Sequence, residues 1–142
     1  LPAGAMLLRV ILSSDKTNIT NMTGGRVAHP LLLSLANIKM EHHNKASNHG
    51  FLLAALLPVT ILNDCLIHKY LDIVLEPLKQ AVRLGHMMLD PVSNLCLCYM
   101  PITAYIVDTP EALMLACVRG LTSCLTLATF KNFGNPFRHP AR

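Results

Sequence analysis

The sequence has few charged residues. Only 14% of its 142 residues are Asp, Glu, Lys or Arg, whereas about a quarter are charged in a typical soluble domain. Apolar residues make up 52% of the chain, which argues against intrinsic disorder and allows one compact core. A buried segment of a larger protein shows such a bias, and so does a membrane protein.

Hydrophobic runs of membrane-spanning length are also missing. The longest apolar stretches are 51–62, interrupted by Thr60, and 113–118, whereas a spanning helix needs about 20 residues. The first nine residues lack a basic region followed by an apolar stretch of signal-peptide length, and the chain does not begin with Met. We therefore expect no membrane partner, and we expect the natural start to lie upstream.

Basic runs and paired cysteines are absent as well. The formal charge is +4, but no three Lys or Arg residues are consecutive, so charge alone supports nucleic-acid binding only weakly. The five cysteines are odd in number and lack paired spacing, which argues against a disulfide framework and fits a reducing compartment. Cys96 and Cys98 have the spacing of a ligand pair, but we interpret them as two strand residues facing one side.

Two hydrophobic strands are each expected to end at an aspartate. Residues 6–12 are apolar and include β-branched residues, and Asp15 follows them, which predicts a buried strand with a carboxylate at its C-terminal end. Residues 95–107 are also largely apolar and lead into Asp108, although Pro101 restricts pairing to the part after it. The same pattern thus occurs twice.

Two further strands are predicted between these aspartates. Residues 31–38 follow His29-Pro30 and form the second strand candidate. Residues 51–57 are ambiguous because Leu and Ala favour a helix, but Pro58 ends the run early and its length favours a third buried strand. The polar segment 16–27 is predicted to be a loop.

The clearest helix prediction covers 64–84. Its apolar residues recur at intervals of three and four, Asp64 can cap it, and Gly85 closes it. Pro77 lies inside the segment and should divide the helix after Val74 or Leu75, because proline lacks a backbone N–H.

Another helix is predicted after the second aspartate. Asp108 or Thr109 caps it, Pro110 fits its first turn, and it continues through 112–118 to end at Gly120. Residues 130–142 have no periodic pattern and are predicted to form an irregular C-terminal tail.

Asp15 and Asp108 are candidates for catalysis and metal binding. In a ribonuclease-H-like core the first and fourth strands lie side by side, so acids at their ends can share divalent ions. Two such ions, about 4 Å apart, stabilise the attacking and leaving oxygens of phosphoryl transfer. Mg²⁺ prefers hard oxygen ligands, which explains carboxylates in these places. For either residue alone, a strand-end Asp that caps a loop or helix is the simpler interpretation.

An ordered series of segments resembles the Plavaka-type transposases of fungi. These belong with the Kyakuja–Dileera–Zisupton and CACTA-like DDE elements, and the likeness runs from about Leu8 onward. The segments that carry it are 10–17, 29–38, Leu56-Leu57-Pro58, 75–79, 104–111 and 133–139.

The resemblance implies a partial ribonuclease-H-like α/β fold: three strands, a helix, a fourth strand and a helix, truncated before the last strand and helix. Residues 1–142 would form one partial domain. Asp15 and Asp108 match the family's first two strand-end acids, which bind Mg²⁺ or Mn²⁺, and the third acid is expected beyond Arg142. The implied function of the intact protein is DNA cleavage and strand transfer in the nucleus, with this fragment inactive alone.

The chain departs from its relatives in two places. Many relatives have Cys-Pro-x-Cys after the helix that begins with Asp-x-Pro-Glu, and this motif is a plausible half of a zinc site. This chain has Cys124-Leu125-Thr126-Leu127 in that place. The connection from Pro58 to Asp64 is short, which suggests a deletion or a mis-spliced gene model.

Other interpretations remain open. His42, His43 and His49 could form a metal cluster, although adjacent histidines in a polar loop are more often exposed, and Lys39, Lys45 and His49 could instead contact phosphate. Cys65 and His68 could form a nucleophile–base pair, but packing and solvation explain them better. The chain could also be a degenerate or domesticated remnant with weak nucleic-acid or protein binding. Exposed apolar edges should in addition favour self-association.

Overall fold

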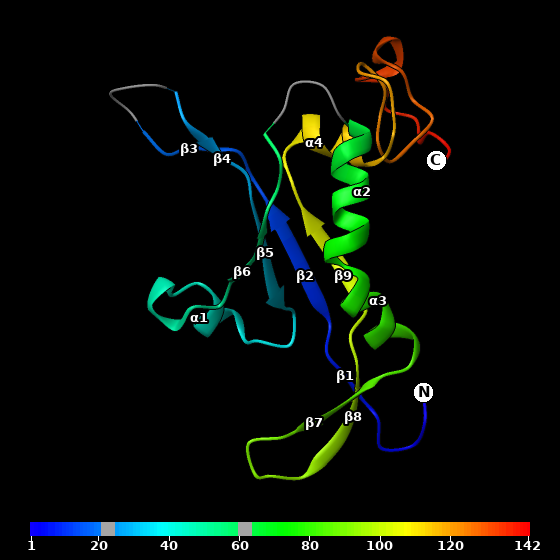
Figure 1. The fold of residues 1–142 in the computed structure, drawn as a ribbon. Coiled ribbons are helices and arrows are strands. Elements are labelled where there is room, and N and C mark those ends of the chain that lie inside the picture. The colour runs from blue at the N-terminus through cyan, green and yellow to red at the C-terminus, as the bar shows by residue number, and fades with distance from the viewer. Residues whose placement is uncertain (21–24, 60–63) are drawn as a thin grey trace. The chain divides into compact units, whose positions relative to one another are not determined.

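The computed structural model describes residues 1–20, 25–59 and 64–142 (Figure 1). The chain forms two compact units, Leu1–Ile106 and Val107–Arg142. Within the described ranges, no helix combines the length and the apolar character needed to cross a bilayer. The predicted single domain of 1–142 stays a prediction.

The first unit is built on a four-stranded sheet with the order β6-β5-β2-β9. Its strands are β2 (Val10–Ser14), β5 (Pro30–Leu35), β6 (Leu52–Leu56) and β9 (Ile102–Ile106). The pairs β2·β5 and β5·β6 are antiparallel, whereas β2 and β9 run parallel. The first and fourth strands of this sheet, counted along the chain, are therefore neighbours, as predicted.

The two central strands hold the core of this sheet. Val10, Leu12 and Ser14 are buried on one face of β2 and alternate with half-buried residues, as the period of two in a strand requires. Leu31 on β5 is fully buried. Burial of these side chains stabilises the sheet, because each removes apolar surface from water.

The edge strand β6 is much more exposed than predicted. Strand structure at 51–57 is confirmed, but the prediction of a buried strand is wrong, because Leu52, Leu53 and Leu56 are 62%, 60% and 57% exposed. Only β5 pairs with β6, so the other side of the strand has no partner within the described part of the sheet.

A second sheet has the order β1-β8-β7. Its strands are β1 (Met6–Leu7), β8 (Leu95–Tyr99) and β7 (His86–Leu89), with β1·β8 parallel and β7·β8 antiparallel. The apolar runs 6–12 and 95–107 were each predicted as one strand, but each forms two strands. The first strand of each run, β1 or β8, belongs to the second sheet, and the other, β2 or β9, belongs to the main sheet. Strand β7 was not predicted.

Proline accounts for the break in the second of these runs. Pro101 lies between β8 and β9 and cannot donate a ladder hydrogen bond, but its carbonyl accepts one from the backbone N–H of Val10. Residues 90–94 form the loop of the β7–β8 hairpin. There the Asp90 carboxylate accepts the backbone N–H groups of Val92 and Asn94 at 2.9 and 2.8 Å.

The predicted long helix is confirmed as two helices. They are α2 (Asp64–Val74) and α3 (Glu76–Arg83), separated at Leu75 as Pro77 required. Ile67 and Leu71 on α2 are buried. The side chain of Asp64 and the chain between residues 59 and 64 lie outside the described residues.

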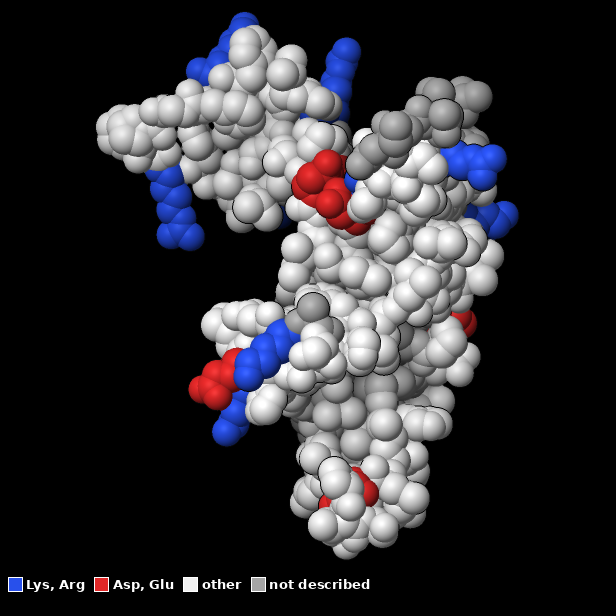
Figure 2. Space-filling model, turned by 90° about the vertical axis from the view of Figure 1, so that its left-hand side faces the viewer, with Lys and Arg blue, Asp and Glu red and all other residues white. Residues whose placement is uncertain are grey.

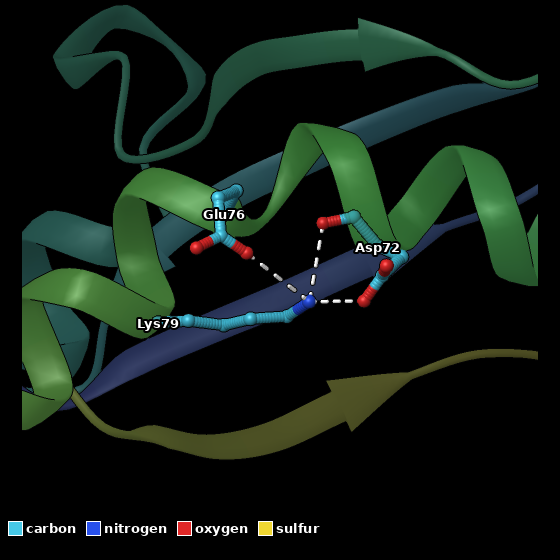
Figure 3. A network of polar contacts seen from close by, with 3 residues as sticks. All are labelled: Asp72, Glu76 and Lys79. Atoms are coloured by element: carbon cyan, nitrogen blue, oxygen red, sulfur yellow. Dashed lines mark hydrogen bonds and ion pairs between the residues drawn. The ribbon is translucent and has the colours of Figure 1, made fainter.

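A charged cluster spans the break between these helices (Figure 3). The Lys79 ammonium group is hydrogen-bonded to the Asp72 carboxylate, donates to the Asp72 carbonyl at 3.2 Å, and lies 3.5 Å from the Glu76 carboxylate. The hydrogen bond with Lys79 lowers the pKa of Asp72, and the same bond raises the pKa of Lys79.

The smaller elements are short. They are β3 (Thr17–Asn18), β4 (Val27–Ala28), α1 (Met40–His43) and a 3₁₀ turn at Ala46–Asn48. β3 and β4 pair within the segment predicted to be a loop, whose residues 21–24, including Gly24, lie outside the description.

The second unit contains α4 (Thr109–Leu115) and a 3₁₀ turn at Phe130–Asn132. The predicted start of α4 is confirmed, but the helix ends at Leu115 instead of continuing to Gly120. Cys117 follows with φ of 52°, a conformation that an α-helix does not accommodate. The tail beyond the 3₁₀ turn is irregular, as predicted, apart from an isolated bridge between Thr126 and Ala141.

Candidate active site

Asp15 directly follows the last residue of β2. Its side chain is exposed. Ser13 pairs with Ile106 in the parallel ladder of β2 and β9, so the two strands end at the same edge of the sheet. Near that edge the Ser14 hydroxyl donates to the Tyr105 phenol oxygen at 3.2 Å, which links the two strand ends within the first unit.

Asp108 follows the last residue of β9 by two positions and belongs to the second unit. Its backbone is extended, and one carboxylate oxygen accepts the backbone N–H of Glu111 at 2.9 Å. Asp108 is therefore the N-cap of α4, which is one of the two alternatives that the sequence left open. The cap fixes the carboxylate at the start of the helix. Glu111 itself is buried, with 8% of its surface exposed.

The two candidate acids have the same spacing in the sequence from a pair of register partners. Ser13 and Ile106 are register partners, and Asp15 and Asp108 each come two residues after one of them. The predicted parallel relationship of the strands that lead to the two acids is confirmed. The sharing of a metal ion by the two carboxylates stays a prediction.

The chemistry of these donors suits a hard cation, but their number is small. Carboxylate oxygens are the ligands that Mg²⁺ and Mn²⁺ prefer. Among residues 1–20, 25–59 and 64–142, no group of three or more His, Cys, Asp or Glu side chains is arranged to hold a metal ion. Carboxylates of this kind suit such an ion, and two of them would supply only part of its coordination.

The histidines of the polar segment do not form a metal cluster. His43 has Nε2 2.6 Å from the hydroxyl oxygen of buried Ser34, and its ring packs edge-on against Phe51 with centroids 4.7 Å apart. The Ser34 hydroxyl donates to the Gly50 carbonyl, so Nε2 of His43 acts as the donor to Ser34. His43 thus helps to anchor α1 against the sheet. The sequence contained no signal for this pair.

The other two histidines of that segment, His42 and His49, are exposed. Cys65 is also exposed and His68 is half-buried on α2, an arrangement that fits solvation and packing. Figure 2 shows that most of the described surface on the face in view carries neither Lys and Arg nor Asp and Glu side chains.

Comparison with known proteins identifies the family. The model of the Plavaka transposase family matches residues 1–142. No curated protein matches the chain, and no solved structure matches it either. Because the family match extends over the whole sequence, the chain belongs to the Plavaka transposase family.

Proposed function

We propose that the chain is part of the catalytic core of a DDE-type DNA transposase, in which Asp15 and Asp108 bind Mg²⁺ or Mn²⁺. The observation that carries this proposal is the parallel pairing of β2 with β9 in the register Ser13 to Ile106. An acid follows each partner by two residues in the sequence, and this equal spacing supports the proposal that both acids serve one site.

A ribonuclease-H-like fold is part of the same proposal. Its support is the main sheet, in which the first three strands are antiparallel neighbours and the fourth is parallel to the first. The connection from the third strand to the fourth contains α2 and α3, as the family resemblance implies, and then the β7–β8 hairpin, which the resemblance does not include.

The proposed site would supply metal-assisted phosphoryl chemistry. When bound, a pair of divalent ions would stabilise the attacking and leaving oxygens of the DNA phosphate. The part played by this chain's residues is to hold the carboxylates in position. The hydrogen bond from Glu111 N–H fixes Asp108, and a fixed carboxylate loses less side-chain entropy when it binds an ion.

We propose that this chain is inactive alone. An Mg²⁺ ion takes six oxygen ligands in a near-octahedral arrangement, and two carboxylates with water hold it weakly. Binding of DNA would then depend on phosphate contacts from scattered cations such as Lys39 and Lys45, and it would weaken as salt rises. The intact protein would act in the nucleus, as expected for a fungal element of this family.

A second candidate is a non-enzymatic remnant of such an element that binds DNA or protein weakly. The sparse charge visible in Figure 2 favours it, because a DNA-binding surface usually gathers Lys and Arg. The two candidates differ in whether both strand-end acids bind metal.

Calorimetric titration with Mn²⁺ separates the two candidates. The variants are Asp15→Asn and Asp108→Asn, with Asp72→Asn on α2 as the matched control. Asn is as good an N-cap as Asp, so α4 should be retained in Asp108→Asn. We expect weak binding in the wild type and the control and none in the two variants. Equal binding in all four proteins would refute the active-site proposal and favour the remnant.

Assays of DNA cleavage and strand transfer complete the test. We expect no product with Mg²⁺ or Mn²⁺. Cleavage that disappears in both Asp15→Ala and Asp108→Ala would support the site and overturn the proposed inactivity of the chain.

A further inference from the structure

A pocket of about 160 Å³ opens on the second sheet, and neither Asp15 nor Asp108 is among the residues that line it. Four sulfur-bearing side chains line it, one from β1, one from β7 and two from β8: Met6, Met88, Cys96 and Cys98. Cys98 is buried, Cys96 is half-buried, and the two methionines are exposed. The lining therefore combines thiols that are shielded from solvent with thioethers that solvent reaches.

The strand register explains why these four side chains line one pocket. Cys98 pairs with Met6 on one side, and Cys96 pairs with Met88 on the other. Paired residues lie on the same face of a sheet, and so do residues two apart on one strand. The interpretation of Cys96 and Cys98 as strand residues that face one side is thus confirmed. Met87 pairs with Leu97 and lies on the opposite face.

We propose that this pocket binds a single copper(I) ion through the thiolates of Cys96 and Cys98, with Met88, the register partner of Cys96, as a thioether ligand. Thiolates and thioethers are soft ligands, and copper(I) is the biological ion that accepts both. On binding, each thiol loses its proton to solvent and forms one sulfur–copper bond. The copper enters as copper(I), so no oxidant or reductant is consumed.

The thiols are available for this exchange. Neither forms a disulfide. Cys98 Sγ lies 3.8 Å from the Cys96 carbonyl oxygen, and Cys96 Sγ lies 3.9 Å from that of Asn94. These are weak hydrogen bonds, because a thiol is a poor donor. Metal–sulfur bonds replace them at little cost.

Other ions fit the pocket less well. Structural zinc takes four ligands from Cys, His, Asp and Glu, and within the described residues no three of these types are arranged around one point. Asp90 also lines the pocket, but Oδ1 accepts the backbone N–H groups of Val92 and Asn94, and Oδ2 accepts the Asn94 side-chain amide at 3.0 Å. Both carboxylate oxygens of Asp90 thus already accept hydrogen bonds, and a hard carboxylate is a poor ligand for copper(I).

A competition titration tests the site. The full chain is mixed with copper(I), kept reduced by ascorbate, and bicinchoninate, whose copper(I) complex is coloured. We expect the wild type to withdraw one equivalent of copper from the dye. Cys96→Ser and Cys98→Ser should each lower the affinity about tenfold or more, since even residues behind the ligands have effects of that size. Zinc(II) should compete poorly.

Two matched controls separate this site from general thiol chemistry. Met88→Leu, inside the pocket, should weaken binding, whereas Met87→Leu, one position along on the other face, should not. Cys65→Ser removes an exposed thiol on α2 and should leave the affinity unchanged. Circular dichroism checks the fold of each variant, and the conservative Met88→Leu tests the site even if Cys98→Ser unfolds. Unchanged affinity in Cys96→Ser and Met88→Leu, or an equal loss in Cys65→Ser, would overturn the proposal.

Discussion

The hydroxyl of Ser14 donates a hydrogen bond to the phenol oxygen of Tyr105, 3.2 Å away, and so joins the last residue of β2 to the penultimate residue of β9. Ser14 is only 2% exposed. The bond therefore lies at the protected end of the strand pair that leads to Asp15 and Asp108.

Removing this bond should destabilise the first unit. Tyr105→Phe should lower the free energy of unfolding by about 1 kcal/mol, the usual net value of such a hydrogen bond. A double-mutant cycle with Ser14→Ala, measured by urea unfolding, isolates the interaction free energy between the two side chains. If the double variant lost only the sum of the stabilities lost in the two single variants, the interaction between Ser14 and Tyr105 would contribute nothing.

The Lys79 cluster predicts a pH window for the helix break. The pKa of Asp72 is lowered in the folded protein. The ion pair therefore stabilises the fold at pH values above 3.8, the ordinary pKa of the group, and this stabilisation is lost as the pH falls through the pKa of Asp72 in the folded protein. The pKa of Lys79 is raised in the folded protein. Its contribution to stability is therefore fully present at pH values below 10.5, the ordinary pKa of the group, and is lost as the pH rises through the pKa of Lys79 in the folded protein.

Lys79→Met should therefore raise the pKa of Asp72 toward its ordinary value. The titration of the Asp72 carboxyl carbon by NMR measures this directly, with Lys69→Met on α2 as the control. The effect on stability should be small because the pair is exposed. An Asp72 pKa that is the same in Lys79→Met and wild type would contradict the assigned cause.

Gly85 should not tolerate a side chain. Its φ is +73°, and a Cβ there would lie 2.8 Å from the Leu97 side chain on β8. Gly85→Ala should lower the free energy of unfolding by more than about 1 kcal/mol, since it combines backbone strain with a clash. Gly4 has φ of +80° and open space around it, so Gly4→Ala measures the strain alone. Equal losses in the two variants would mean that the contact with Leu97 is unimportant.

The exposed edge strand predicts self-association. β6 presents apolar side chains and unpaired backbone groups at one edge of the main sheet, which favours edge-to-edge pairing. Leu53→Lys should shift the chain toward the monomer in sedimentation experiments. Leu84→Lys, at an even more exposed site beyond α3, should not. Monomeric wild-type protein at all concentrations would disprove this prediction.

The sequence was informative where one local property decides the structure. Pro77 divides the long helix because proline lacks a donor, and Asp108 caps α4 because its side chain reaches the N–H of Glu111 three residues later. Strand-forming runs followed by an acid also predicted β2 and β9 and their parallel pairing.

The sequence was uninformative where distant contacts decide. An apolar run does not reveal which sheet it joins, so the split of 6–12 between β1 and β2 was missed. Burial of a strand depends on what covers its faces, which is why exposed β6 was predicted to be buried. The contact of Ser34 with His43 joins a strand to a separate helix, and neither residue type signals it.

The proposed active site requires that Asp15 and Asp108 bind the same divalent ion. Mn²⁺ broadens the NMR signals of nearby nuclei, so substoichiometric Mn²⁺ added to ¹⁵N-labelled protein reports even weak binding. We predict broadening of the backbone amides at 14–16 and at 108–111 together, with both effects lost in Asp15→Asn and in Asp108→Asn. Broadening confined to one strand end, or centred on Asp72 and Glu76 and unchanged in both variants, would refute a metal site shared by Asp15 and Asp108.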